Sequence, residues 1–220
     1  MRKLFLSSAG ITLNTKEEFI NLLGNDPTKI TVGFIPTGAD PEEDKSFVQW
    51  SIDQIEDIGM KRVNIDLKAE NKESLYDKLS KVDVIWVNGG NAFYLLDQAR
   101  KSGFDEIIPK LLDDGKIYVG VSAGSYLACP NIEPAKWKHI SDPDVVGLKD
   151  LSAFNLVKFF IVVHFNNKYE QDVLNGAKTT KYPVVALRDN QAVLVKGTTV
   201  RIIGNKEKIM VLNNSEHLIQ

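Results

Sequence analysis

The sequence predicts an α/β protein in which helices cover both faces of a mainly parallel β-sheet. Short runs rich in Val, Ile and Phe alternate with longer amphipathic segments, and several runs are apolar at consecutive positions, as in strands buried on both faces. The segments between the runs are long enough for the helical crossovers that join parallel strands. The runs are Arg2–Leu6, Ile30–Ile35, Arg62–Leu67, Val82–Val87 and Ile117–Val121.

Two of the intervening segments carry signals for the start of a helix. Residues Thr15–Glu18 have the pattern of a capping box, in which a threonine and an acid satisfy backbone N–H groups of the first turn. Residues Asp40–Glu43 offer an N-cap, a proline at the first helical position and an acid three residues after the cap, and Gly59 is the expected stop. The apolar face expected for this second helix consists of Phe47, Trp50, Ile55 and Ile58.

The pattern changes after about residue 185, where short strands are separated by tight turns. Strands are expected at Gln191–Val195, Thr198–Ile203 and Lys208–Leu212, with Lys196-Gly197 and Gly204-Asn205 as hairpin turns. We expect them to extend the same sheet in antiparallel fashion. No internal repeat or flexible linker interrupts the chain, so residues 1–220 are expected to form a single domain.

Composition excludes several classes of protein. The chain has 220 residues with 27 basic and 29 acidic side chains, and its net charge of -2 gives no electrostatic basis for binding nucleic acid or an anionic membrane. A single cysteine rules out an intrachain disulfide and fits a reducing, cytoplasmic location. The apolar run Leu4-Phe5-Leu6 is too short for a signal peptide. No cluster of His, Asp and Glu has metal-ligand spacing, so no metal or other cofactor is expected.

The sharpest motif is Gly120-Val121-Ser122-Ala123-Gly124, a G-x-S-x-G sequence that follows an apolar run and precedes a segment compatible with a helix. This is the arrangement of a nucleophile elbow, in which a serine projects from a strained turn above the sheet. Flanking residues must be small because bulkier ones would clash with neighbouring strands. The alternative is a tight turn that merely contains a serine. The placement between strand and helix favours Ser122 as a nucleophile.

A second turn of small residues, Val87-Asn88-Gly89-Gly90-Asn91, also joins a strand to a helix. In a parallel sheet this loop and the serine turn share the carboxyl edge, where ligands of open α/β sheets bind. We therefore expect an N–H of Gly90, or of Gly89, to form an oxyanion hole with the N–H of Ala123. The simpler alternative is a glycine turn with Asn91 as the N-cap of a helix that Gly103 ends.

A serine nucleophile needs a base, and the chain has three histidines. His164 follows the apolar run at residues 159–163, which has the pattern of a buried strand, so it is expected at a strand's carboxyl end. His139 lies in the irregular segment Pro130–Leu151, a long loop of a kind that is usually functional or mobile, and His217 lies in the C-terminal tail. His164 is therefore the expected base.

The carboxylate that would orient this base is less well defined by the sequence. Asp189 ends the run Val184–Leu187 and is the first candidate, although an Asp-Asn pair is also ordinary turn chemistry. Asp142, Asp144 and Glu133 are competing candidates. Cys129 would suit a cysteine hydrolase of the glutamine-amidotransferase type. It lies seven residues beyond Ser122, however, and is expected to be a packing residue.

Taken with these residues, the sequence resembles the peptidase E family of serine peptidases, the group that also contains the cyanophycinases. The resemblance spans most of the chain, and its core consists of residues 87–93, the stretch from Gly120 to Pro130 that contains Leu-Ala-Cys-Pro, and His164-Phe165. It implies a class I glutamine-amidotransferase-like α/β sandwich. It also implies that Ser122 is the nucleophile, His164 the base and Asp189 the acidic member.

Characterised members of that family remove N-terminal aspartate from Asp-X dipeptides, and a basic residue is expected to hold the aspartyl carboxylate. Where the family has an arginine-containing segment after the histidine, this chain runs Asn166-Asn167-Lys168 without an arginine. Lys168, with Asn91, is the expected substrate-binding residue. We thus expect a cytoplasmic serine peptidase, a monomer or homodimer, that acts on small peptides. The alternative is a relative that has lost turnover and binds ligands.

Overall fold

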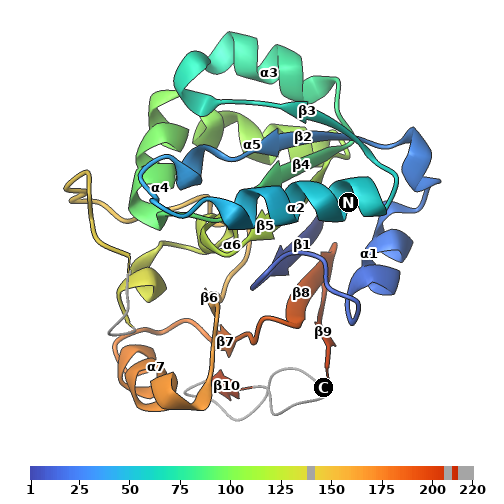
Figure 1. Ribbon diagram of the computed structural model, residues 1–220. Coiled ribbons are helices and arrows are strands. Elements are labelled where there is room, and N and C mark those ends of the chain that lie inside the picture. Colours follow the sequence, from blue (N-terminus) through green and yellow to red (C-terminus); the bar gives the residue numbers. More distant parts are fainter. Residues whose placement is uncertain (138–141, 206–209, 213–220) are drawn as a thin grey trace.

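A computed structural model describes residues 1–137, 142–205 and 210–212 of the chain. A seven-stranded sheet in the order β3-β2-β4-β5-β1-β8-β9 forms its centre (Figure 1). The first five strands in that order pair in parallel, and β8 and β9 add in antiparallel fashion beside β1. This confirms the predicted mainly parallel sheet with an antiparallel C-terminal extension. The strands are β1 (Lys3–Ser7), β2 (Thr31–Ile35), β3 (Lys61–Asn64), β4 (Val84–Val87), β5 (Ile117–Val121), β8 (Gln191–Lys196) and β9 (Thr199–Gly204).

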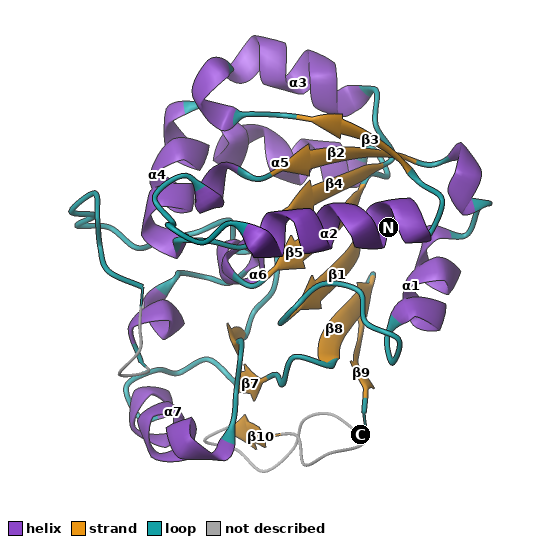
Figure 2. Ribbon diagram, in the orientation of Figure 1, coloured by secondary structure: helices purple, strands orange, loops and turns teal. Residues whose placement is uncertain are grey.

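Helices cover both faces of this sheet (Figure 2). Side chains alternate along β1, so that Leu4 and Leu6 join one buried cluster and Phe5 joins the other. The Leu4 side is packed by α3 (Lys72–Ser80), α4 (Ala92–Lys101), α5 (Phe104–Asp113) and α6 (Ala123–Ala128). The Phe5 side is packed by α1 (Lys16–Leu23) and α2 (Ser46–Asp57). In the described part of the chain, no helix has the length and apolar character needed to cross a membrane.

A second, smaller sheet holds β6 (Phe160–Val162), β7 (Val184–Ala186) and β10 (Met210–Leu212) in the order β10-β7-β6, near α7 (Glu170–Ala177). The prediction that the last strand extends the central sheet is therefore wrong, because β10 pairs with β7 instead of β9. In the central sheet β8 pairs with β1, and β6 and β7 pair in parallel with each other. Short 3-10 turns lie at Pro27–Lys29, Thr37–Ala39, Leu67–Ala69, Glu133–Lys136 and Asn167–Tyr169.

The structure corrects both predicted helix starts. Thr15 does precede α1, but its hydroxyl turns back to Thr12, donating to the Thr12 carbonyl at 3.2 Å and accepting the Thr12 N–H at 3.0 Å. It therefore makes no side-chain cap, and the predicted capping box is not formed.

The second helix begins at Ser46 and not at Pro41. The Asp40 carboxylate lies 2.7 Å from the Lys68 ammonium, and the carboxylate of Asp44 accepts the Ser46 N–H at 2.8 Å. Asp40 thus pairs with Lys68 and does not cap a helix, and the five residues between Asp40 and Ser46 form a loop. Gly59 does follow the helix in a left-handed conformation, as expected.

Candidate active site

Ser122 occupies a strained turn between β5 and α6. Its φ of 51° and ψ of −111° lie outside the regions that L-residues ordinarily adopt. A Cβ atom on Gly124 would lie 2.1 Å from the Val87 carbonyl oxygen, and one on Gly120 would lie 2.6 Å from the Gly124 carbonyl oxygen. The predicted need for small residues on both sides of the serine is thus met by close approaches of the backbone.

The glycine loop after β4 lies directly beside this turn. A Cβ on Gly89 would be 3.1 Å from the Ser122 Cβ, so the loop backbone passes close to the serine side chain. Gly90 has a φ of +123°, and a Cβ there would lie only 2.1 Å from the Gly38 carbonyl oxygen. The Asn91 N–H donates to that same oxygen at 2.8 Å. The structure thus brings Gly89, Gly90 and Ser122 together at the carboxyl edge of the sheet, as the sequence predicts.

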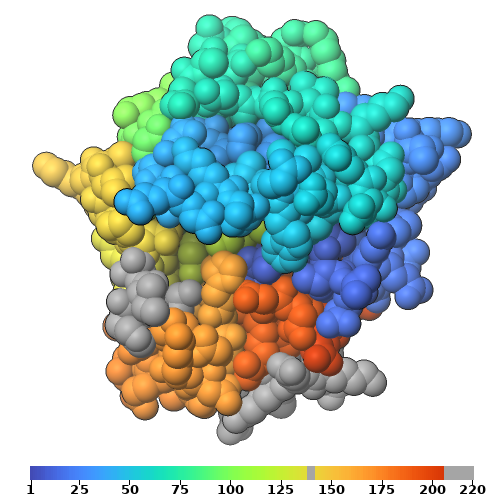
Figure 3. Space-filling model, viewed as in Figure 1, coloured from blue at the N-terminus to red at the C-terminus, as the bar shows by residue number. Residues whose placement is uncertain are grey.

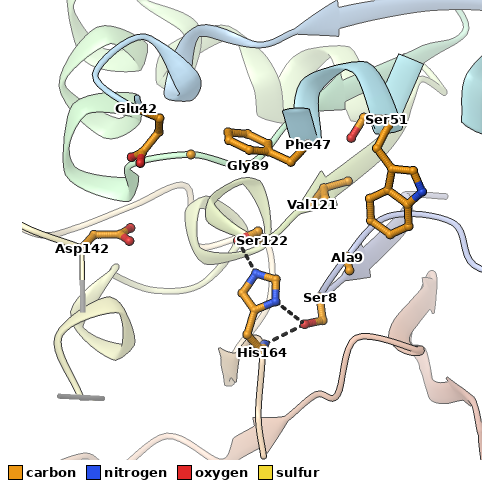
Figure 4. A pocket seen from close by; sticks show the side chains of 12 residues that line it. Ser8, Ala9, Glu42, Phe47, Ser51, Gly89, Val121, Ser122, Asp142 and His164 are labelled. Carbon is orange, nitrogen blue, oxygen red and sulfur yellow. Dashed lines mark hydrogen bonds between the residues drawn. The ribbon is translucent and has the colours of Figure 1, made fainter. Parts of the chain in front are cut away.

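Ser122, His164 and Asp189 form a continuous hydrogen-bonded chain. The Ser122 Oγ lies 2.9 Å from the His164 Nε2 (Figure 4), and the His164 Nδ1 lies 2.6 Å from the Asp189 Oδ1. His164 follows β6 by two residues and has a φ of 53°, while Asp189 lies in the turn between β7 and β8. His164 is therefore positioned by a strand of the smaller sheet, and Ser122 by a strand of the central sheet.

Ser8 is a member of this cluster that the sequence does not predict. Its hydroxyl accepts the backbone N–H of His164 at 2.7 Å and donates to the Asp189 Oδ1 at 2.9 Å. The side chain is completely buried, directly after β1. The sequence offers one indication of this role, the position of Ser8 at the carboxyl end of the strand that pairs with β5. A serine at that position matches no catalytic motif.

The Asp189 carboxylate is unusually exposed for a group in contact with a histidine of this kind of cluster. The side chains of His164 and Asp189 keep 44% and 66% of their exposure, whereas the aspartate of a Ser-His-Asp triad is ordinarily buried. Solvent competes for an exposed carboxylate, so burial alone does not fix its position. The buried Ser8 hydroxyl supplies a fixed contact to both the carboxylate and the histidine backbone.

A cavity of about 350 Å³ opens above Ser122. In the space-filling view, α2 lies above the orange and red C-terminal segments, and the yellow-green segment after β5 is visible between them (Figure 3). Phe47 and Trp50 of α2 line this pocket, and 47% of Trp50 is exposed. They belong to the apolar face predicted for this helix, but of that face only Ile55 is fully buried in the core.

Two acids line the same pocket, Glu42 from the loop before α2 and Asp142 from the irregular segment. The Asp142 carboxylate accepts the Ala92 N–H at 2.9 Å. Burial raises the pKa of the Glu42 carboxyl above its ordinary value, and the charge of Asp142 raises it further, with a smaller opposing effect of Lys45. Sequence reasoning places Glu42 in a helix and considers Asp142 only as an orienting carboxylate.

Other expected residues are not brought to the pocket. The Lys168 ammonium lies 4.7 Å from the centre of the Tyr169 ring, and Lys168 is not among the described residues that line the pocket. The amide of Asn91 accepts the Tyr94 N–H at 3.0 Å and donates to the Pro143 carbonyl at 2.9 Å, so it serves as a buried helix cap. This is the simpler role considered for Asn91.

The competing carboxylates Asp144 and Glu133 do not line this pocket. Asp144 accepts the N–H groups of residues 146–148, and Glu133 begins a 3-10 turn that does not line this pocket. His139 and His217 lie outside the described residues. Asp189 is thus the carboxylate that contacts His164.

Cys129 is fully buried at the end of α6. Burial raises the pKa of its thiol to about 12, so at neutral pH it stays protonated and is a poor nucleophile. This agrees with the packing role expected from its position. Residues 1–137, 142–205 and 210–212 contain no group of three or more His, Cys, Asp and Glu side chains arranged to hold a metal ion.

Comparison with protein families and with individual proteins matches this chain to peptidases in each case. The family model described as Peptidase family S51 matches residues 4–203. The uncharacterized peptidase PM1590 of Pasteurella multocida (strain Pm70) is 33% identical over 209 residues, which are 93% of this chain and 99% of that protein. The peptidase E of Shewanella denitrificans is 27% identical over 86% of this chain and 80% of its own length.

A solved structure extends the similarity to the fold. A 1.5 Å crystal structure from Listeria monocytogenes EGD-e, provisionally described as a peptidase E protein, superposes with a TM-score of 0.80. The two are 26% identical, and the match covers 94% of this chain and all of the other. The arrangement of the central sheet and its flanking helices is thus shared with that protein.

Proposed function

Because the chain belongs to peptidase family S51, we propose that it is a serine peptidase that hydrolyses small peptides with Ser122 as its nucleophile. The observation that carries this proposal is the 2.9 Å contact between the Ser122 Oγ and the His164 Nε2 at the floor of an open pocket. A serine hydroxyl is a weak nucleophile unless a base removes its proton, and this contact is within the required reach.

The geometry supports the following sequence of steps. The Ser122 Oγ attacks the peptide carbonyl carbon while the His164 Nε2 takes its proton, and the 2.6 Å contact from Nδ1 to Asp189 stabilises the imidazolium. His164 then protonates the leaving amine, which gives an acyl-serine. Water, deprotonated by the same nitrogen, attacks the acyl carbon and releases the acid with Ser122 restored.

The negative charge on the carbonyl oxygen needs donors that are already in place. The Ala123 N–H is the first of α6, and the first N–H groups of a helix have no partner within the helix. We assign the second donor to the Gly90 N–H, because the loop passes beside Ser122 and is held by its contact with Gly38. The Ser122 N–H itself donates to the Ser7 carbonyl at 3.0 Å, so it is already occupied.

Ser8 acts in this scheme as a positioning residue. We expect Ser8→Ala to lower kcat by about 10- to 100-fold with little change in KM, because the hydroxyl holds His164 and Asp189 in place while the proposed attack on the substrate is made by Ser122. Steady-state kinetics on one peptide substrate measures both constants. The control is Ser7→Ala, which removes a neighbouring buried hydroxyl that contacts Gly120 and Gly10 instead. Equal kcat losses in the two variants would contradict the positioning role.

The proposal is tested by covalent labelling. A fluorophosphonate probe should form a bond between its phosphorus and the Ser122 Oγ with loss of fluoride, and mass spectrometry of the digested protein should place the adduct on the peptide that contains Ser122. Prior denaturation should abolish labelling, because the reaction needs His164 in contact with the serine. An adduct on any other serine, or none under conditions that label a known serine hydrolase, would refute the assignment.

A further inference from the structure

The pocket above Ser122 carries an uneven charge. Glu42 and Asp142 line it, and its described lining contains no lysine or arginine. In the close view both carboxylates lie on one side of Ser122, while Ser8 and Ala9 lie on the other (Figure 4). A substrate seated with its carbonyl at Ser122 therefore meets two carboxylates on one side.

The Glu42 carboxylate is poorly compensated by the protein itself. Among the described residues it has no hydrogen-bond or ion-pair partner, and burial and Asp142 together disfavour its charge. Lys45 is the cation that acts on it, but the Lys45 ammonium donates to the Asp40 carbonyl at 3.1 Å. Two carboxylates at one end of a partly buried pocket attract a cation more strongly than the same charges in open water.

Two basic side chains that follow His164 in the sequence, Lys168 and Arg188, contact other groups. The Lys168 ammonium lies over Tyr169, and the Arg188 guanidinium lies over Phe165 and donates to the Asn167 side chain at 2.7 Å. Among the described lining residues, an aspartyl carboxylate placed in this pocket would therefore meet carboxylates and no guanidinium. The described lining does not suit an acidic first residue.

On the strength of the proposed function, we infer that the pocket selects peptides that present a primary ammonium group to Glu42 and Asp142, next to the bond that is cleaved. The ammonium can come from the free amino terminus or from a lysine side chain, and both carry the same chemistry. The apolar wall formed by Phe47, Trp50 and Val121 then receives the uncharged part of the substrate. Peptides with an N-terminal aspartate are disfavoured, because a further carboxylate would enter the same pocket.

Four fluorogenic amide substrates separate these possibilities. Leucine amide carries only the α-ammonium, acetyl-lysine amide carries only a side-chain ammonium, acetyl-leucine amide carries neither, and aspartyl amide adds a carboxylate. We expect kcat/KM for one of the first two to exceed that for acetyl-leucine amide by about tenfold or more, as for a charge-assisted hydrogen bond. The substrate that leads identifies the source of the ammonium.

The charge is tested by Glu42→Gln, which should reduce that preference ratio by about tenfold. The matched control is Glu43→Gln, which removes the same charge from an exposed neighbour that does not line the pocket. An unchanged ratio in Glu42→Gln, or the same reduction in Glu43→Gln, would overturn the inference. So would a wild-type preference for aspartyl amide.

Failure of the inference and failure of the proposed function give different results. If Ser122 is labelled and the amides are cleaved without regard to charge, the peptidase assignment stands and the ammonium site is refuted. If Ser122 is not labelled and none of the amides is cleaved, the proposed function itself is refuted, together with the inference that depends on it.

Discussion

The Ser122→Ala variant should lose at least about 10⁴-fold in kcat/KM on any peptide that the wild-type protein cleaves. The loss is expected because the Oγ is the proposed nucleophile, and among the described residues Ser122 is the serine that contacts the His164 Nε2, whereas Ser8 contacts the backbone N–H and the Nδ1 of His164. The folded state should be little affected, since in the described chain the hydroxyl of Ser122 contacts only the half-exposed His164 side chain. Activity assays and thermal unfolding of the same preparations measure both effects.

The control for this variant is Ser125→Ala. Ser125 lies one turn along α6, fully buried, and its hydroxyl lies 2.8 Å from the carbonyl oxygens of both Ser7 and Gly120. Its loss should lower the free energy of unfolding by about 1–3 kcal/mol but reduce kcat/KM far less than the loss of Ser122. Peptide hydrolysis that survives in Ser122→Ala at near wild-type rates would exclude this serine as the nucleophile.

Replacing Gly90 by alanine should have the largest effect on both folding and activity among the loop positions. The new Cβ would lie 2.1 Å from the Gly38 carbonyl oxygen and 2.6 Å from the Ala39 nitrogen, in a backbone conformation with a φ of +123°. We expect a loss of at least about 3 kcal/mol in the free energy of unfolding, combining backbone strain with overpacking. Labelling of Ser122 should fall as well, because the loop that carries the proposed second oxyanion donor must move.

Gly115→Ala separates these two contributions. Gly115 also has a left-handed φ, of +94°, but a Cβ there would meet nothing within 4 Å. This variant should lose only about 1–2 kcal/mol from strain and keep full labelling of Ser122. Urea denaturation measures the loss in the free energy of unfolding for each variant. Equal losses would show that the close contact with Gly38 does not contribute to the destabilisation of Gly90→Ala.

The elements that could be predicted from the sequence are those with local signals. Apolar runs gave the parallel strands, and the small residues around Ser122 gave the serine turn, because each reflects a constraint on a few adjacent residues. His164 and Asp189 could be nominated because both follow apolar runs. Their contact with Ser122 depends on the pairing of distant strands and is visible only in the structure.

The rest of the site lacks such signals. Ser8 is the second of two adjacent serines at the end of β1, and only the positions of the His164 backbone and the Asp189 carboxylate give its hydroxyl a role. Glu42 follows a sequence that reads as a helix start, and the ion pair of Asp40 with Lys68, far along the chain, turns that segment into a loop at the pocket. The smaller sheet was missed for the same reason, because its pairings join β6, β7 and β10 across intervening segments.

Because the site is divided between two sheets, its residues are synthesised at different times. Ser122 and both proposed oxyanion donors precede residue 124, whereas His164 and Asp189 belong to the last part of the chain. Synthesis from the N-terminus therefore produces the serine turn before the proposed base and carboxylate have been added to the chain. Moreover, the Asp189 turn directly precedes β8, whose pairing with β1 holds this turn beside Ser8. A chain that ends before residue 164 thus carries Ser122 without the proposed base, and under the proposed function it could not hydrolyse peptides.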